Sequence, residues 1–276
     1  MAEPFGIAAG TVGVAAAFTA CIDCFEYVQF GRNFGRDFQT DLLALNCAKL
    51  RLSRWGEAVK IYDDPNLGKR DASLAEIQVA KDTFYQILVL FSNTQKISEK
   101  HKMKARDRED LSVFAPCDID PTVTALADNM RALVIRRQKG SSVLKTASWA
   151  LYHRSEFKRL IEDIVSLISN LEKIFPEPQL QLIADEEAAQ VHDKSSLKLL
   201  ETAARDVDPL LETATKKGHK YSNFVVKGKA HTGDAFHGDW HGNANGASHI
   251  YDGVEVGENG KVLVGNKYGG KDFWDD

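Results

Sequence analysis

Cysteine and proline are scarce in this chain of 276 residues, and charge of one sign is nowhere concentrated. The four cysteines, Cys21, Cys24, Cys47 and Cys117, lack the spacing of a disulfide framework, and the CxxC pair of Cys21 and Cys24 has no second CxxC or nearby histidine pair to complete a zinc site. Before the first apolar run the only charged side chain is Glu3, so the basic start of a secretion signal is missing. We therefore expect reduced cysteines, no bound metal and a cytoplasmic location.

Sequence motifs for catalysis are also missing. The chain has no phosphate-binding loop, no GxGxxG after a strand, no GxSxG and no HExxH. Basic and acidic residues are mixed through the body, and the net charge is −4, whereas a nucleic-acid binder would present a basic face. These absences predict a protein that is not an enzyme, needs no cofactor and binds no nucleic acid.

One uncharged segment lies near the start of the chain, from residue 5 to residue 22. Its length is at the lower limit for crossing a bilayer, and it is rich in alanine and glycine, with Gly6 and Gly10 forming a small-xxx-small pair. Burial as the first helix of a bundle is favoured over a membrane span. A conditional helix, buried in one state and inserted in another, fits this marginal hydrophobicity best. The membrane-active candidates in the segment are Phe5, Gly6, Gly10, Val14 and Phe18.

Helical periodicity dominates the chain up to about residue 217, where apolar residues recur every three or four positions. Two helix starts are marked, one by Ser73 with Glu76 in a capping box and one by Asp120 before Pro121. Residues 111–115 could form an isolated strand. The pattern predicts a mainly α fold, with helices over residues 38–61, 73–98, 121–137, 141–152, 156–175, 180–191 and 195–204.

The composition changes after residue 217. Twelve of the twenty glycines and five of the eight histidines lie in residues 218–276, and short apolar runs there alternate with period two. Too few apolar residues are present for this tail to bury a core of its own. We therefore expect a helical domain of residues 1–217 and a tail of residues 218–276, which is disordered in the soluble monomer and gains order only by stacking its repeats.

The tail contains two copies of a glycine-punctuated pattern, at about residues 224–242 and 251–269. An ungapped offset of 27 positions superposes three glycine pairs, and it places Ala235 on Val262. Stacked strands of like repeats satisfy their backbone groups in an amyloid, and glycines permit the corners of a winding chain. The candidate strand residues are Ala235, Phe236, Gly238, Asp239, Val254, Val256, Val262, Val264, Gly265 and Asn266, and the candidate aromatic cover is Tyr268, Phe273 and Trp274.

Several stretches of the chain together resemble one protein family. They are EPFGIAAG with CIDCFEYVQFGRNFGRDF near the start, RLSRWGEAVKIYDDP, and the closing VLVGNKYGGKDFWDD. These stretches are similar to the fungal HET-s/HET-S heterokaryon-incompatibility proteins. The resemblance implies an N-terminal α-helical HeLo domain and a C-terminal prion-forming segment that folds as a β-solenoid amyloid with two rungs per molecule.

The resemblance also implies a mechanism, in which an existing amyloid templates the tail and the ordered tail displaces the end of the HeLo domain. The N-terminal segment is then released, inserts in the membrane and makes it leaky, which kills the mixed fungal cell. On this chain the segment is residues 5–22, continuing to about Phe34, with Asp23 at its end and Asn33 where the killing and non-killing types differ. The implied partners are amyloid fibrils of this chain or of a related protein, membrane lipid after activation, and further HeLo-domain copies.

Two other functions stay open at this point. The chain could be a non-killing prion partner, which forms amyloid and activates a related HeLo killer without inserting itself. It could also be a helical adaptor whose tail binds a partner without forming fibrils. Membrane leakage separates the first alternative from a killing protein. Thioflavin binding with proteolytic protection of residues 219–276 would exclude the second.

Overall fold

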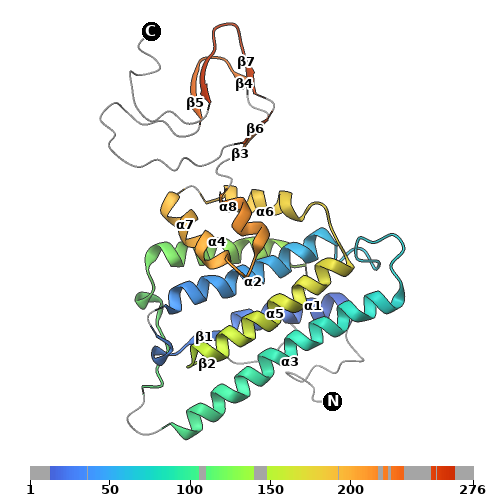
Figure 1. Cartoon of the computed structure of the whole chain (residues 1–276), viewed down its shortest axis with the longest axis vertical. Coiled ribbons are helices and arrows are strands. Elements are labelled where there is room, and N and C mark those ends of the chain that lie inside the picture. Colours follow the sequence, from blue (N-terminus) through green and yellow to red (C-terminus); the bar gives the residue numbers. More distant parts are fainter. Residues whose placement is uncertain are drawn as a thin grey trace.

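Figure 1 shows the computed structural model of the chain, a body of packed helices with short strands at one end. The structure describes residues 13–35, 37–105, 110–139, 148–191, 193–216, 220–222, 225–232, 250–252 and 254–264. Eight α-helices lie in this described part of the chain, all of them before residue 217. The mainly α fold that the periodicity predicts is therefore confirmed.

Most helices follow the apolar periodicity and the capping residues. The Ser73 hydroxyl accepts a hydrogen bond from the Glu76 N–H, and the Glu76 carboxylate accepts one from the Ser73 N–H, so both halves of the capping box are present. Periodicity did not predict α8, because eight residues cover barely two turns. The bounds are α1 Val14–Glu26, α2 Phe38–Ala58, α3 Leu74–Lys104, α4 Pro121–Arg137, α5 Arg154–Ile174, α6 Leu180–Ala189, α7 Lys194–Ala204 and α8 Pro209–Lys216.

Helix α2 lies at the centre of the body and packs against α1, α4, α5, α6 and α7. Fifteen of its twenty-one residues are buried, among them Lys49, Arg51 and Arg54. A buried charge is tolerated only when it is paired. Each of these cations therefore pairs with a carboxylate from another element, Lys49 with Glu26 of α1, Arg51 with Glu172 of α5 and Arg54 with Glu187 of α6.

A short parallel strand pair extends the helical body. β1 (Val28–Phe30) follows α1 and pairs with β2 (Trp149–Leu151), and the strand expected at residues 111–115 is present as a single bridge between Val113 and Gly31. The helix expected over residues 141–152 is wrong at its end, where β2 lies. Pairing with β1 sets the conformation there, and local periodicity does not report such a distant partner.

Six short strands lie in the described part of the tail, in three parallel pairs (Figure 1). β3 (Lys220–Ser222) pairs with β6 (Ile250–Asp252), β4 (Val225–Val226) with β7 (Glu255–Val256), and β5 (Lys229–Thr232) with β8 (Lys261–Val264). β3, β4 and β5 are therefore stacked on β6, β7 and β8 within one chain, and the first stacked segment begins at Lys220, before the expected start of the first repeat at residue 224. This is the route to order that the sequence predicts for the tail.

The register expected for the two repeats is wrong. The ungapped offset of 27 places Ala235 on Val262, whereas the structure pairs Ala230 with Val262, thirty-two positions apart. The β4–β7 pair has an offset of thirty. The two offsets differ because two residues connect β4 to β5 while four connect β7 to β8. An ungapped comparison cannot find a register that contains this insertion.

Candidate functional site

The first helix, α1, is buried along most of its length. Its buried residues are Ala17, Phe18, Thr19, Ala20, Cys21, Ile22, Cys24 and Phe25, and Val14 packs partly buried against the core. The burial that the sequence favours for this segment is thus confirmed for residues 17–22, while residues 14–16 are half-buried. Among the described residues, no helix has the length and apolar character needed to cross a membrane. Phe5, Gly6 and Gly10 lie outside the described residues.

Phe18 of α1 lies in an aromatic socket and is only 3% exposed. Its ring meets the rings of Phe84 and Tyr62 edge to face, with centroids 5.7 and 6.0 Å away. The α2 side of the socket is open because residue 56 is glycine, since a Cβ on Gly56 would lie 2.3 Å from the Phe18 ring. The close approach of α1 to α2 therefore depends on this glycine.

Two hydrogen bonds from α1 side chains add to this packing. The hydroxyl oxygens of Thr19 and Tyr62 are 3.0 Å apart, and the Cys21 thiol donates to the Phe84 carbonyl with an Sγ–O distance of 3.0 Å. Both α1 side chains are buried. Departure of α1 would break both bonds and expose their polar atoms to solvent.

The end of α1 carries two carboxylates with different surroundings. Asp23 accepts a long hydrogen bond of 3.4 Å from Gln138, and its buried Oδ2 has no hydrogen-bond partner among the described residues. Glu26 pairs with Lys49 of α2, and its Oε2 lies 3.3 Å from Nε of Arg131 in α4. Burial lowers the pKa of Lys49, and the Glu26 charge opposes this shift. Glu26 thus ties the end of α1 to α2, whereas Asp23 is poorly satisfied there.

The chain that follows α1 is held between two other segments. β1 pairs with β2, and a 3-10 turn at Arg32–Phe34 comes next. The Asn33 side chain is exposed and donates to the Asp110 carbonyl at 2.9 Å, while the Arg32 N–H donates to the Ser112 carbonyl at 2.9 Å. Release of a segment that continues to Phe34 would therefore break these strand contacts as well as unpack α1.

The buried thiols allow the position of α1 to be measured. Burial raises the pKa of Cys21, Cys24 and Cys47, whereas Cys117 is exposed. Because the thiolate is the reactive form, we expect a maleimide to label Cys117 quickly in the folded chain and the other three only after opening. Mass spectrometry of the labelled peptides checks this. Fast labelling of Cys21 in a chain with native circular dichroism would contradict the burial of α1.

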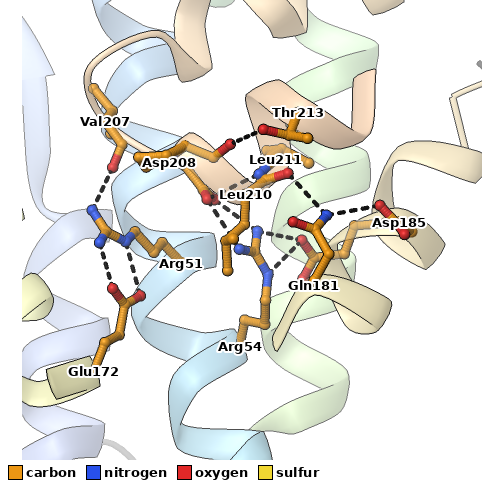
Figure 2. A network of polar contacts seen from close by, with 12 residues as sticks. Arg51, Arg54, Glu172, Gln181, Asp185, Val207, Asp208, Leu210, Leu211 and Thr213 are labelled. Carbon is orange, nitrogen blue, oxygen red and sulfur yellow. Dashed lines mark hydrogen bonds and ion pairs between the residues drawn. The ribbon is translucent and has the colours of Figure 1, made fainter. Parts of the chain in front are cut away.

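On another face of α2, a buried charge cluster joins the body to the last helix (Figure 2). Arg54 is 1% exposed and donates to both carboxylate oxygens of Asp208, at 3.0 and 2.7 Å, and to Glu187 Oε2, at 2.9 and 2.6 Å. Burial alone lowers the pKa of Arg54, but the charges of Asp208 and Glu187 outweigh it and raise that pKa. The guanidinium stays charged, so loss of either carboxylate leaves a buried cation partly unpaired.

A second arginine binds the same loop. Arg51 donates to the Val207 carbonyl at 2.8 Å and makes a bidentate ion pair with Glu172 of α5. Asp208 also caps α8, because its Oδ1 accepts from the Leu211 N–H at 3.1 Å. The loop before α8 is thus bound to α2 at two consecutive residues, as Figure 2 shows.

The candidate strand residues lie partly in the described tail. Val256 is in β7, Val262 and Val264 are in β8, and Val254 comes just before β7. Val256 and Val264 are 47% and 40% exposed, which leaves apolar surface on the stacked strands. The other candidates lie outside the described residues: Ala235, Phe236, Gly238, Asp239, Gly265, Asn266, Tyr268, Phe273 and Trp274.

Sequence reasoning did not predict Gly56 or the Arg54 cluster, although both lie in the stretch RLSRWGE. The available signal was the pair Arg51 and Arg54, three residues apart among apolar positions, which a buried helix tolerates only with paired carboxylates. Their location was not predictable, because Glu187 and Asp208 are 133 and 154 residues further along the chain than Arg54.

Comparisons with known proteins relate these features to a family. The HeLo family model, described as "Prion-inhibition and propagation", matches residues 6–200. The chain is 39% identical to heterokaryon incompatibility protein S of Podospora anserina strain S and 39% identical to heterokaryon incompatibility protein s of Podospora anserina, with 100% of each chain covered in both comparisons.

Solved structures agree with the sequence comparisons. The HET-S N-terminal domain superposes with a TM-score of 0.72 at 41% identity, covering 78% of this chain and 96% of that one. A mutant HET-s N-terminal domain superposes with a TM-score of 0.68 at 40% identity, covering 74% of this chain and 96% of that one. With the buried α1, the helical body and the glycine-rich repeats, these matches show that the chain belongs to the HeLo-domain family of heterokaryon incompatibility proteins.

Proposed function

We propose that this chain is a cell-death protein of heterokaryon incompatibility, in which amyloid templating of the C-terminal repeats releases the N-terminal segment to permeabilise membranes. The observation that supports this most is the parallel stacking of the two repeats. Each of the three strand pairs has only two strands in the described residues. A parallel stack of like repeats can be extended by another chain in the same geometry, since each layer presents backbone groups to the next.

Geometry supports a coupling between the stacked repeats and the helical body. Two rungs advance a fibril by about 10 Å per molecule, whereas a domain of this size is roughly 40 Å across. Only residues 217–219 separate the end of α8 from the start of β3, and the four Cα–Cα steps across them span at most about 14 Å. Neighbouring bodies would collide in a fibril unless the end of the helical domain gives way when the repeats stack.

The element released in this proposal is the segment of residues 5–22, continuing through β1 to about Phe34. Exposing its apolar side chains to water costs about 25 cal/mol per Å² of apolar surface, and a bilayer offers them a new apolar environment. The chain is proposed to be cytoplasmic until activation and then to move to the cell membrane. Its proposed partners are fibrils of this chain or of a related prion-domain protein, membrane lipid, and further HeLo-domain copies.

Dye leakage from liposomes tests this proposal. Full-length chain is added to vesicles with and without preformed fibrils of residues 218–276, and maleimide labelling of Cys21 is followed in parallel samples that contain no vesicles, because a membrane-inserted thiol would be shielded. We expect leakage and Cys21 labelling only when chain and fibrils are both present, with fibrils alone and an unrelated amyloid as controls.

Each other outcome changes the assignment. Conversion of the soluble tail to fibrils without leakage would identify the chain as a non-killing prion partner. Absence of both conversion and leakage would contradict the proposal and favour the adaptor function.

A further inference from the structure

Helix α2 contacts α1 on one face and the loop that precedes α8 on another, while α8 itself packs on α6 and α7. Lys49 and Gly56 are seven residues apart, hence on one face, and both contact α1. Arg51 and Arg54 are three residues apart on another face, and both bind the loop that precedes α8. Positions 49 and 51 are separated by about 200° around the helix axis. One helix therefore connects the two elements that the proposed function sets free.

We infer that the ion pair between Arg54 and Asp208 is an autoinhibitory latch, which holds the loop before α8 on α2 and thereby keeps α1 buried until the repeats are ordered. This inference rests on the proposed function and adds the contact through which ordering of the tail reaches α1. Asp208 directly precedes Pro209, the first residue of α8, and accepts from the Leu211 N–H in its first turn. Withdrawal of α8 into the stacked repeats therefore takes this carboxylate away from Arg54.

Loss of the Asp208 carboxylate unbalances the buried charges. Arg54 then keeps only Glu187, which also accepts from Arg137 of α4 at 2.7 Å. Arg137 also pairs with Glu57 of α2, so the loss falls on Arg54, whose buried charge then shares the Glu187 carboxylate with Arg137. A shift of α2 that relieves this charge also moves Gly56, which lies two residues further along the helix. Because the contact between Gly56 and Phe18 leaves no room for an added atom, such a movement disturbs the packing of α1.

Three variants test the latch. Asp208→Asn removes the charge from the pair. Arg54→Met with Asp208→Leu makes the same contact apolar and leaves Glu187 paired with Arg137, a replacement that buried ion pairs often tolerate. Asp206→Asn is the matched control, because Asp206 is exposed in the same loop and asparagine accepts its left-handed backbone, at φ 64°.

Each full-length variant is measured in a Cys117→Ser background for Cys21 labelling, dye leakage without fibrils and amide hydrogen exchange. We expect Asp208→Asn to label Cys21 about 100-fold faster than the parent chain and to leak dye without fibrils. Asp206→Asn and the apolar pair should label slowly and still need fibrils. In Asp208→Asn, the amides of α1 should exchange quickly while those of α5 stay protected.

Three results would overturn the latch. The first is that Asp208→Asn leaks dye only when fibrils are added, and the second is that the apolar pair labels Cys21 as fast as Asp208→Asn does. The third is that the amides of α5 exchange together with those of α1, which indicates general unfolding. If Asp208→Asn does not fold, Asp208→Glu takes its place, because it moves the carboxylate by one methylene. Its Cys21 labelling, dye leakage and amide exchange are then compared with those of the apolar pair and of Asp206→Asn. Failure of the proposed function is distinguishable, because the parent chain would then not leak with fibrils, whereas Cys21 labelling of the variants still tests the latch.

Discussion

Substitution of Gly56 by alanine is expected to free α1 from the helical body in the absence of any fibril. The added Cβ would lie 2.3 Å from the Phe18 ring, and its three nearest atoms all belong to that ring. Overpacking of a core contact costs about 1–3 kcal/mol, and here the strain falls on the contact between α1 and α2. We expect a lower melting temperature, faster labelling of Cys21, and dye leakage without fibrils.

A double substitution separates this steric effect from a general loss of stability. Phe18→Ala removes the ring that the new methyl group would strike, so Gly56→Ala should cost nothing further in that background. In that background the better helix propensity of alanine should even raise the free energy of unfolding by up to about 1 kcal/mol. Gly13→Ala is the matched control, because a Cβ at Gly13 meets nothing within 4 Å. If Gly56→Ala lowers the free energy of unfolding equally with Phe18 and with Ala at position 18, the clash between residue 56 and the Phe18 ring is contradicted.

Substitution of Val262 by proline is expected to slow fibril growth strongly and to leave the helical body intact. The Lys261 N–H donates to the Gly228 carbonyl at 3.0 Å, and successive N–H groups of a strand point to opposite sides. The Val262 N–H therefore faces away from β5, where a further rung would stack. Proline has no N–H, and one unmade backbone bond of about 1–3 kcal/mol weakens the binding of a new chain by about 10- to 100-fold.

Glu258→Pro is the matched control for this experiment. The Gly260 N–H donates to the Gly257 carbonyl at 2.8 Å, which places Glu258 at the second position of a turn, where proline is favoured. Thioflavin fluorescence measures growth from wild-type seeds, and circular dichroism measures the helical body. If Val262→Pro grows as fast as Glu258→Pro, the second repeat does not receive the next chain through β8.

Prediction from the sequence succeeded where the signals are local. The capping box at Ser73 and the Asp120-Pro121 start marked α3 and α4, because side chains within three residues decide where a helix begins. Prediction was wrong where a distant partner decides the conformation. β2 is a strand because β1 pairs with it, and the repeat register depends on two extra residues between β7 and β8.

The candidate site likewise has features that the sequence shows locally and features that depend on distant residues. The uncharged segment, the glycine-rich repeats and the family resemblance are visible in the chain itself, because composition and spacing are properties of neighbouring residues. The elements that hold α1 in place are not. Gly56 has meaning only when the Phe18 ring lies against it, and Arg54 only when Glu187 and Asp208 are brought beside it.

The sequence by itself thus determined a mainly helical body and a glycine-rich tail with two repeats, since periodicity, capping and composition act locally. The HeLo family was indicated by the resemblance of whole stretches of the chain to known proteins. Only the tertiary structure decided that α1 is buried against Gly56, that a buried ion pair fastens the loop before α8 to another face of the same helix, and which strand residues face each other. Close packing and buried charge pairing join residues far apart in the chain, so their partners become defined only when the chain is folded.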